Sequence, residues 1–179
     1  QDKALLSACA APSAQAQCTA LLTDALAGAA TQRDLVLAGK LPDYYWAGSD
    51  FSATAKLLNS PQFKGATSEQ AAAMAAKLGE IILDFTPIVG DLKGFVEAQT
   101  PFDYTLAALG TLGPVGDAAA KLVKEAKVAM AAGDANKAID KLSEAQNVAL
   151  HQRHIDELAA NMGKPAVSDP SLSNIVDSL

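Results

Sequence analysis

The sequence predicts an all-α fold: a compact, alanine-rich bundle of about 6–8 helices with a long C-terminal helix. Alanine makes up roughly a fifth of the 179 residues, and it favours helices over strands. Hydrophobic residues account for 50% of the chain, which is enough to build a core. Because small side chains each bury little area, the helices are expected to approach one another closely.

Residues 2–38 are expected to form a short helix, a turn and a longer helix. Pro12 ends the first helix, and Ser13 is suited to cap the second. Cys9 and Cys18 flank this turn, and a disulfide between them would join the two helices and indicate an oxidising compartment. The alternative is a pair of buried thiols that behave as small apolar groups.

Two helices are expected before the middle of the chain. The first begins at Ser49 or Asp50 and ends at Leu58, where Asn, Ser and Pro follow. The second has Ser68 as its N-cap and runs toward Asp84. This order of caps and breaks predicts one helix after another with short connections.

The middle of the chain, residues 81–117, consists of two apolar segments interrupted by proline and glycine. Residues 87–91 (Pro-Ile-Val-Gly-Asp) and 114–117 (Pro-Val-Gly-Asp) repeat one pattern, in which proline starts a helix and glycine lies just inside it. We expect consecutive, largely buried helices joined by proline-initiated turns. Glycine inside a helix costs about 1 kcal/mol relative to alanine, so it indicates close backbone packing or a segment that rearranges.

The last third of the chain predicts two amphipathic helices, over residues 118–132 and 135–162. The second has an apolar face that continues through Ile155 and Leu158. The turn between them resembles that of a tetratricopeptide repeat, so a helical scaffold stays open as an alternative. Residues 1–164 are expected to form one domain, and residues 165–179 a linker and the start of another.

The charge balance argues against nucleic acid as a partner. The chain has 14 Lys and Arg against 20 Asp and Glu, a formal net charge of −6. No basic stripe is evident in the sequence, and nucleic-acid-binding domains usually show one. No stretch is long and apolar enough to predict a membrane-spanning helix.

Residues that could carry chemistry are few. The sequence contains no nucleophile elbow and no phosphate-binding loop, so we expect no cofactor and no catalysis within this chain. His151 and His154 lie one helical turn apart and are a weak candidate for a metal pair, with two solvated histidines as the alternative. Asp84, Asp91 and Asp103 are expected to cap helices.

Aromatic and proline side chains are the candidates for contact with a receptor or a membrane, because aromatic residues often anchor interfaces. Burial in the core is the alternative for each of them. The candidates are Tyr44, Tyr45, Trp46, Phe85, Pro87, Phe95, Phe102 and Tyr104.

Residues 83–98 and 100–104 resemble the pre-toxin region of large bacterial polymorphic toxins, notably the CdiA-type effectors of contact-dependent growth inhibition. The most specific block consists of Thr86, Pro87, Val89, Gly90, Asp91 and Gly94. Residues 112–121, the cysteine pair and residues 43–45 fit the same pattern. The resemblance covers the chain from residue 2 to about residue 124.

The resemblance implies a translocation domain of a secreted toxin. Such a toxin lies at the surface of the producing bacterium and reaches the periplasm and inner membrane of the target cell. Its implied partners are an inner-membrane protein of the target, the inner membrane itself and a cognate immunity protein. A catalytic domain, often a nuclease, would lie beyond Leu179. The alternative is that this chain is itself the toxic effector, as a small nuclease or a membrane-permeabilising helical domain.

Overall fold

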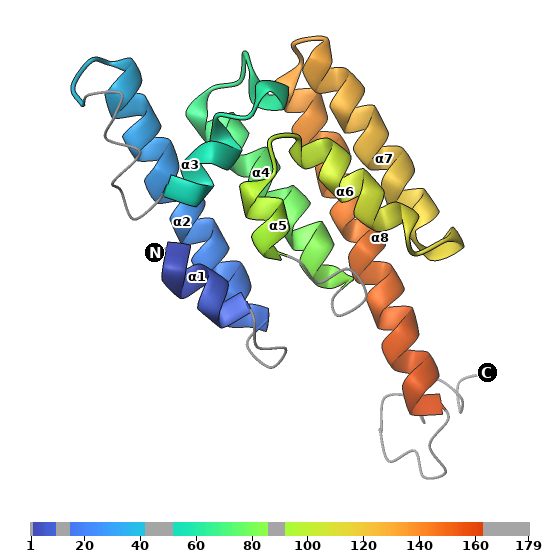
Figure 1. Ribbon diagram of the computed structural model, residues 1–179. Coiled ribbons are helices and arrows are strands. Elements are labelled where there is room, and N and C mark those ends of the chain that lie inside the picture. The colour runs from blue at the N-terminus through green and yellow to red at the C-terminus, as the bar shows by residue number, and fades with distance from the viewer. Residues whose placement is uncertain (1, 10–14, 42–51, 86–91, 163–179) are drawn as a thin grey trace, which may run out of the picture.

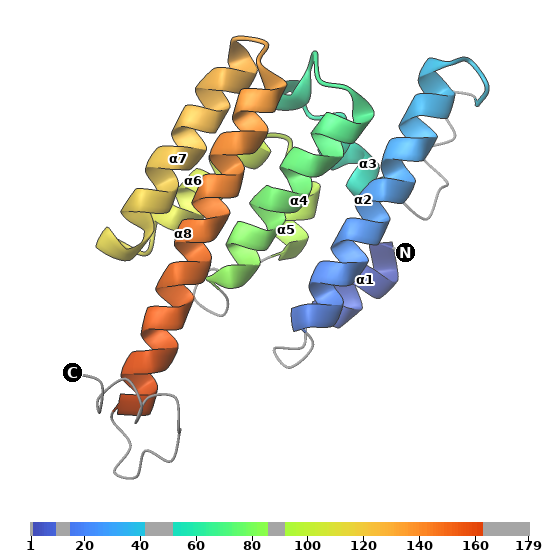
Figure 2. The same ribbon diagram turned by 180° about the vertical axis from the view of Figure 1, so that it is seen from behind.

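The computed structural model describes residues 2–9, 15–41, 52–85 and 92–162, and this part of the chain contains helices and turns without a strand. The all-α prediction is therefore confirmed, as is the long C-terminal helix. The helices form two layers (Figures 1 and 2). One layer contains α2 (Gln15–Leu37), α4 (Ser68–Asp84), α8 (Ala135–Met162) and α7 (Pro114–Ala131). The other contains α1 (Asp2–Cys9), α3 (Ser52–Leu58), α5 (Leu92–Glu97) and α6 (Pro101–Gly110).

A disulfide joins α1 to α2 at the N-terminal end of the bundle. Cys9 and Cys18 are bonded, with their Cα atoms 4.9 Å apart. Cys18 is buried, and Leu5 of α1 is fully buried in the same core. The short first helix is thus held both by a covalent bond and by apolar packing. Ser13, which was predicted to cap the second helix, lies outside the described residues.

The N-cap of α4 is Thr67, and the prediction that Ser68 caps this helix was wrong. The Thr67 hydroxyl accepts a hydrogen bond from the backbone N–H of Gln70 at 3.1 Å, and the Gln70 side chain accepts one from the Thr67 N–H at 3.0 Å. Ser68 is buried as the first helical residue. This reciprocal pair is a capping box, which requires Gln three residues after the cap and therefore selects Thr67.

The prolines of the middle segment start helices as predicted, where the structure describes them. Pro101 and Pro114 lie in the first turns of α6 and α7. Gly116 explains the glycine of the Pro-Val-Gly-Asp pattern, because a β-carbon there would lie 2.3 Å from the carbonyl oxygen of Leu109. The glycine therefore allows α6 and α7 to approach closely at this crossing. The matching residues 87–91 lie outside the described part of the chain.

The core runs through both layers and joins all eight described α-helices. Phe63, in the 3-10 helix η3 (Pro61–Phe63), meets Phe102 of α6 edge to face, with ring centroids 5.8 Å apart. The largest fully buried side chains are Phe63, Phe95, Phe102, Leu5, Leu22, Leu26, Leu57, Leu58, Met74, Leu78, Ile81 and Ile82. Alanine fills many of the remaining contacts, which confirms an alanine-rich bundle.

The apolar face of α8 is buried only along its first half. Ala138, Leu142 and Ala149 are fully buried, whereas Ile155 and Leu158 are each 46% exposed. The end of α8 extends beyond the rest of the bundle (Figures 1 and 2). The described α-helices range from 6 to 28 residues, which does not fit a scaffold of equal helical repeats. None of them combines the length and apolar character needed to cross a membrane.

Candidate functional site

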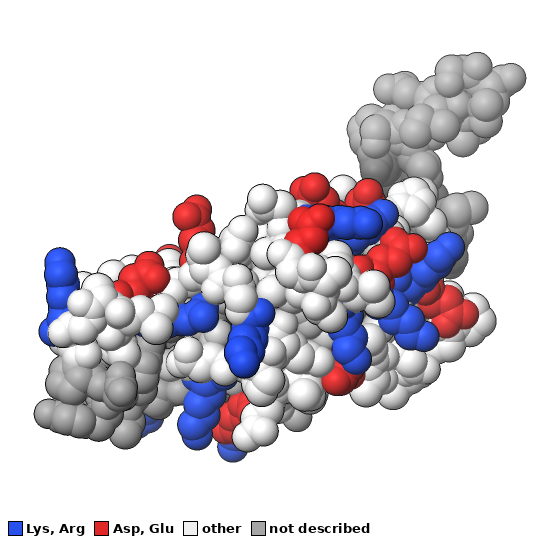
Figure 3. All heavy atoms as spheres, turned by 90° about the horizontal axis from the view of Figure 1, so that it is seen from above, with Lys and Arg blue, Asp and Glu red and all other residues white. Residues whose placement is uncertain are grey.

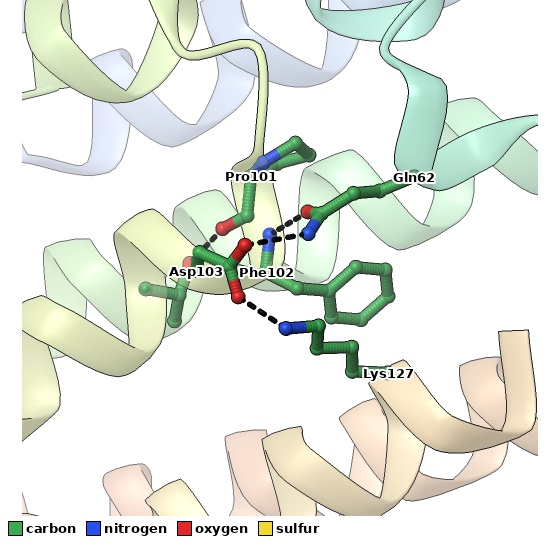
Figure 4. Close-up of polar contacts among 6 residues, drawn as sticks. Gln62, Pro101, Phe102, Asp103 and Lys127 are labelled. Atoms are coloured by element: carbon green, nitrogen blue, oxygen red, sulfur yellow. Dashed lines mark hydrogen bonds and ion pairs between the residues drawn. The ribbon is translucent and has the colours of Figure 1, made fainter. Parts of the chain in front are cut away.

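Four residues from three elements form a polar link beside the buried Phe63–Phe102 pair (Figure 4). The side chain of Gln62, in η3, accepts a hydrogen bond from the Phe102 N–H at 2.8 Å and donates one to Asp103 at 2.9 Å. The Lys127 ammonium of α7 pairs with the other Asp103 oxygen at 2.5 Å. The segment 100–104 is thereby tied to η3 on one side and to α7 on the other.

Gln62 takes the place of an N-capping side chain for α6, because it accepts a hydrogen bond from a backbone N–H of the first turn. Thr100 occupies the N-cap position of α6 without a side-chain cap hydrogen bond. The Gln62 amide instead satisfies the N–H of Phe102, one of the donors that a helix leaves unpaired in its first turn. Asp103 lies within that turn and not at the cap, so the expectation that it caps the helix was wrong. A carboxylate in the first turn is still stabilised by the positive end of the helix dipole.

We predict that Gln62→Leu lowers the free energy of unfolding by about 1–3 kcal/mol, because it leaves the Phe102 N–H without its acceptor. Lys127→Met should cost less than about 1 kcal/mol, since that ion pair is 43% and 45% exposed on its two sides. Urea unfolding followed by circular dichroism measures both. Gln17→Leu, at an exposed position of α2, is the control. A larger loss from Lys127→Met than from Gln62→Leu would refute this ranking.

Three of the aromatic contact candidates are core residues in this folded state. Phe95 and Phe102 are fully buried and Phe85 is 5% exposed, so none of them offers a surface to a receptor or a membrane here. Tyr104 is half-buried, with its ring 6.1 Å from that of Phe95. The sequence pattern could not separate these aromatics from contact residues, because both environments favour large apolar side chains.

Some of the other predicted site residues lie in described helices, and the rest lie outside the described residues. Gly94 lies in α5 and is half-buried. His151 and His154 lie on the exposed part of α8. Among the described residues, no three His, Cys, Asp or Glu side chains are grouped so that they could hold a metal ion. Outside the described residues lie Tyr44, Tyr45, Trp46, Thr86, Pro87, Val89, Gly90 and Asp91.

A groove of about 560 Å³ lies between α7 and α8, and it was not predicted from the sequence. Four lysines line it, although the chain as a whole is acidic, and the other lining residues are three apolar and two acidic ones. A hydrogen bond with Glu125 and the charge of Glu144 raise the pKa of Lys141, which lies 3.4 Å and 3.6 Å from these carboxylates. The lining residues are Lys121, Lys124, Glu125, Val128, Ala129, Ala132, Asp134, Lys137 and Lys141.

Helical spacing explains which residues of α7 line the groove. It also explains why the sequence alone did not predict the groove. Lys121, Lys124, Val128 and Ala132 follow one another at three- and four-residue intervals, so they lie along one face of α7. The lysines of α8 join them only because the two helices pack as a pair. The signal available in the sequence was the lysine spacing within each predicted helix, which does not show that the two faces meet.

The described part of the chain is thus a helical bundle with a disulfide, in which the segment 100–104 is joined to η3 and to α7. The chain is similar to the protein named Deoxyribonuclease CdiA of Dickeya dadantii (strain 3937), with 45% identity over 64 residues. The match covers 34% of this chain and 2% of that protein, so the chain spans a small part of its relative's length. No protein-family model matches the chain. No solved structure matches it either. The chain thus carries a region related to the CdiA toxins.

This similarity contradicts one expectation from the sequence. The sequence predicts no enzymatic activity in the chain, because it shows no familiar catalytic motif and the resemblance implies a nuclease domain beyond Leu179. The relative that it matches is itself named a deoxyribonuclease. The absence of a recognisable motif was a weak basis for that expectation, since catalytic groups are defined by their geometry and often come from distant positions in the sequence.

Proposed function

We propose that this chain is the receptor-dependent translocation region of a secreted interbacterial toxin of the CdiA type. In this role it engages an inner-membrane protein of the target bacterium and carries a toxin into the cytoplasm. The observation that carries the proposal is the 64-residue match to a CdiA protein. The resemblance of residues 83–104 to a pre-toxin region favours the delivery part of such a toxin over its other parts.

The construction of the core supports this role. Alanine occupies many of the buried positions, and each alanine contributes far less burial energy than leucine or phenylalanine would. A bundle built in this way opens at a lower cost, which suits a domain that must cross or enter a membrane. Opening would also expose Phe85, Phe95 and Phe102, and in that state they would become available for the receptor or membrane contact predicted from the sequence.

The disulfide supports a route outside the cytoplasm of the producing cell. Disulfides persist in oxidising compartments, which include the cell surface and the bacterial periplasm. The Cys9–Cys18 bond therefore fits a protein that is secreted to the cell surface and delivered to the periplasm and inner membrane of the target. In this proposal the producing cell protects itself with an immunity protein that neutralises the delivered toxin.

Competition on target bacteria tests the translocation role. Attacking cells that display a full toxin with this region are mixed with targets in the presence of the purified, oxidised chain. We expect the chain to protect the targets, because it occupies the receptor. It should give no protection against an attacker whose toxin has an unrelated delivery region, which is the specificity control. A chain that leaves killing by both attackers unchanged would count against the role.

Cleavage of DNA is the second candidate function, and the name of the similar Dickeya protein is the observation that favours it. Produced in the cytoplasm of a cell without an immunity protein, such a nuclease should stop growth and degrade the chromosome. If His151 and His154 take part, the double change His151→Ala and His154→Ala should restore growth. Normal growth with intact DNA would remove this candidate.

A further inference from the structure

The groove between α7 and α8 is lined by charged side chains and by three apolar ones, which we call its floor: Val128, Ala129 and Ala132. Val128, at the centre of the α7 face, is 68% exposed, which makes it one of the most exposed large apolar side chains among the described residues. Ala129 and Ala132 extend the floor beside it. Seen from above, Lys and Arg side chains are interspersed with Asp and Glu at the end of the molecule that carries α6–α8 (Figure 3).

The acidic groups of the groove already have partners in the fold. Glu125 pairs with Lys141. Asp134 accepts a hydrogen bond from the backbone N–H of Lys137 at 3.0 Å and so caps the start of α8. The groove therefore retains the cationic side chains of Lys121, Lys124 and Lys137, for which the described residues provide no ion pair. The groove thus presents apolar side chains next to these lysines, which is complementary to a helix face that presents apolar side chains next to carboxylates.

We propose that this groove binds an acidic amphipathic helix of a partner protein. Apolar side chains of that helix contact Val128, Ala129 and Ala132, and its Asp and Glu side chains pair with Lys121, Lys124 and Lys137. The inference rests on the groove alone and does not depend on the translocation role.

The dimensions of the groove favour a helix as its occupant. The α7 face from Lys121 to Ala132 extends over eleven residue steps, which at 1.5 Å each is about 16 Å, or about three helical turns. A third helix lying along a packed pair can place its side chains at positions i, i+3, i+4 and i+7 against such a strip.

The composition of the groove favours a protein over a nucleic acid or a lipid surface. Single-stranded nucleic acids stack their bases on aromatic side chains, whereas this floor is aliphatic. An anionic membrane is a broad surface and gains little from a concave site between two helices.

Binding of a designed peptide to the full chain tests the proposal. The probe is a fluorescein-labelled, 14-residue helical peptide with leucine along one face and glutamate on both sides of it. A scrambled peptide of identical composition is its control. We expect the helical peptide to bind measurably by fluorescence anisotropy, to bind more weakly at higher salt, and to bind at least about tenfold more tightly than the scrambled peptide.

Two sets of variants assign this binding to the groove. Replacing Lys121, Lys124 and Lys137 together with glutamine should weaken binding at least about fivefold, and replacing them with glutamate at least about tenfold. Lys3, Lys40 and Lys64 are exposed elsewhere, and their triple replacement with glutamate is the matched control. Circular dichroism checks that each variant remains folded. Val128→Ser should weaken binding without changing its salt dependence.

Several outcomes would overturn the proposal. It fails if the helical peptide does not bind, or if the control triple variant weakens binding as much as the groove variant. It also fails if duplex DNA, single-stranded DNA or phosphatidylglycerol vesicles bind more tightly than the peptide and lose that binding in the groove variant. In that case the groove recognises phosphate groups and not a carboxylate-bearing helix.

Discussion

Replacing Phe102 with alanine is expected to lower the free energy of unfolding by about 3–5 kcal/mol. The Phe102 side chain is fully buried and packs edge to face against Phe63, so its removal deletes apolar contacts and leaves a cavity between α6 and η3. Its backbone N–H also joins the link through Gln62. Urea unfolding followed by circular dichroism provides the measurement. A domain with an alanine-rich core has little stability to spare, so a large unfolded fraction without denaturant is also expected.

Leu37→Ala is the control for this large-to-small change. Leu37 is 72% exposed at the end of α2, and its truncation should change stability by less than about 0.5 kcal/mol. If Phe102→Ala were as mild as Leu37→Ala, Phe102 would not be a core residue. The expectation from the sequence that it contacts a receptor or a membrane from the surface would then be restored.

Gly116→Ala should destabilise the bundle by about 1–3 kcal/mol. The added β-carbon would lie 2.3 Å from the Leu109 carbonyl oxygen, and a backbone atom cannot move aside as a flexible side chain can. The helices α6 and α7 must therefore separate, although alanine has the better intrinsic helix propensity. Thermal and urea unfolding both measure this loss.

Gly110→Ala distinguishes this packing effect from the general effect of glycine in a helix. Gly110 is the last residue of α6 and is exposed, and a β-carbon added there would have no neighbouring atom within 4 Å. This substitution should be neutral or stabilise by up to about 1 kcal/mol. Equal behaviour of the two variants would mean that α6 and α7 do not approach as closely as the structure places them.

The fold could be predicted from local sequence signals to a large extent. The start of α6 follows from Pro101, and the bounds of α8 follow from the break at Gly133 and its helical periodicity. The amphipathic pattern predicted a helix from residue 118, whereas α7 begins at Pro114, because the Pro-Val-Gly-Asp segment forms its first turn. The cap of α4 was misplaced by one residue, because the choice between Thr67 and Ser68 depends on which of them has Gln70 as its reciprocal partner. The position of a helix cap therefore depends more on the hydrogen bonds that the side chains can form than on the capping preference of each residue type.

The site was harder to predict, because it depends on which helices pack together. Phe95 and Phe102 suit an interface and a core equally well in the sequence, and only the arrangement of α3, α4, α5 and α6 decides in favour of the core. Gln62 lies forty residues from Phe102 in the chain, and no local pattern marks it as the group that satisfies the first turn of α6. The lysines of α7 and α8 likewise form one groove only through tertiary packing.

The polar link and the Gly116 contact together give the segment 100–117 a structural role. Lys127 and Gln62 fix its start, and the close approach at Leu109 fixes its end. Part of the resemblance to pre-toxin regions therefore lies in residues that hold the bundle together. In the proposed translocation role, these contacts would have to break when the domain opens at the target membrane.

Exchange of this region between two CdiA-type toxins tests the translocation role most directly. Residues 1–164 of this chain replace the equivalent region of a toxin that attacks a different set of bacteria, while the toxic domain stays the same. The proposed role predicts that the target range follows residues 1–164 and that the mode of killing follows the toxic domain. If the target range remains that of the recipient toxin although the hybrid is displayed and folded, this chain does not select the target cell.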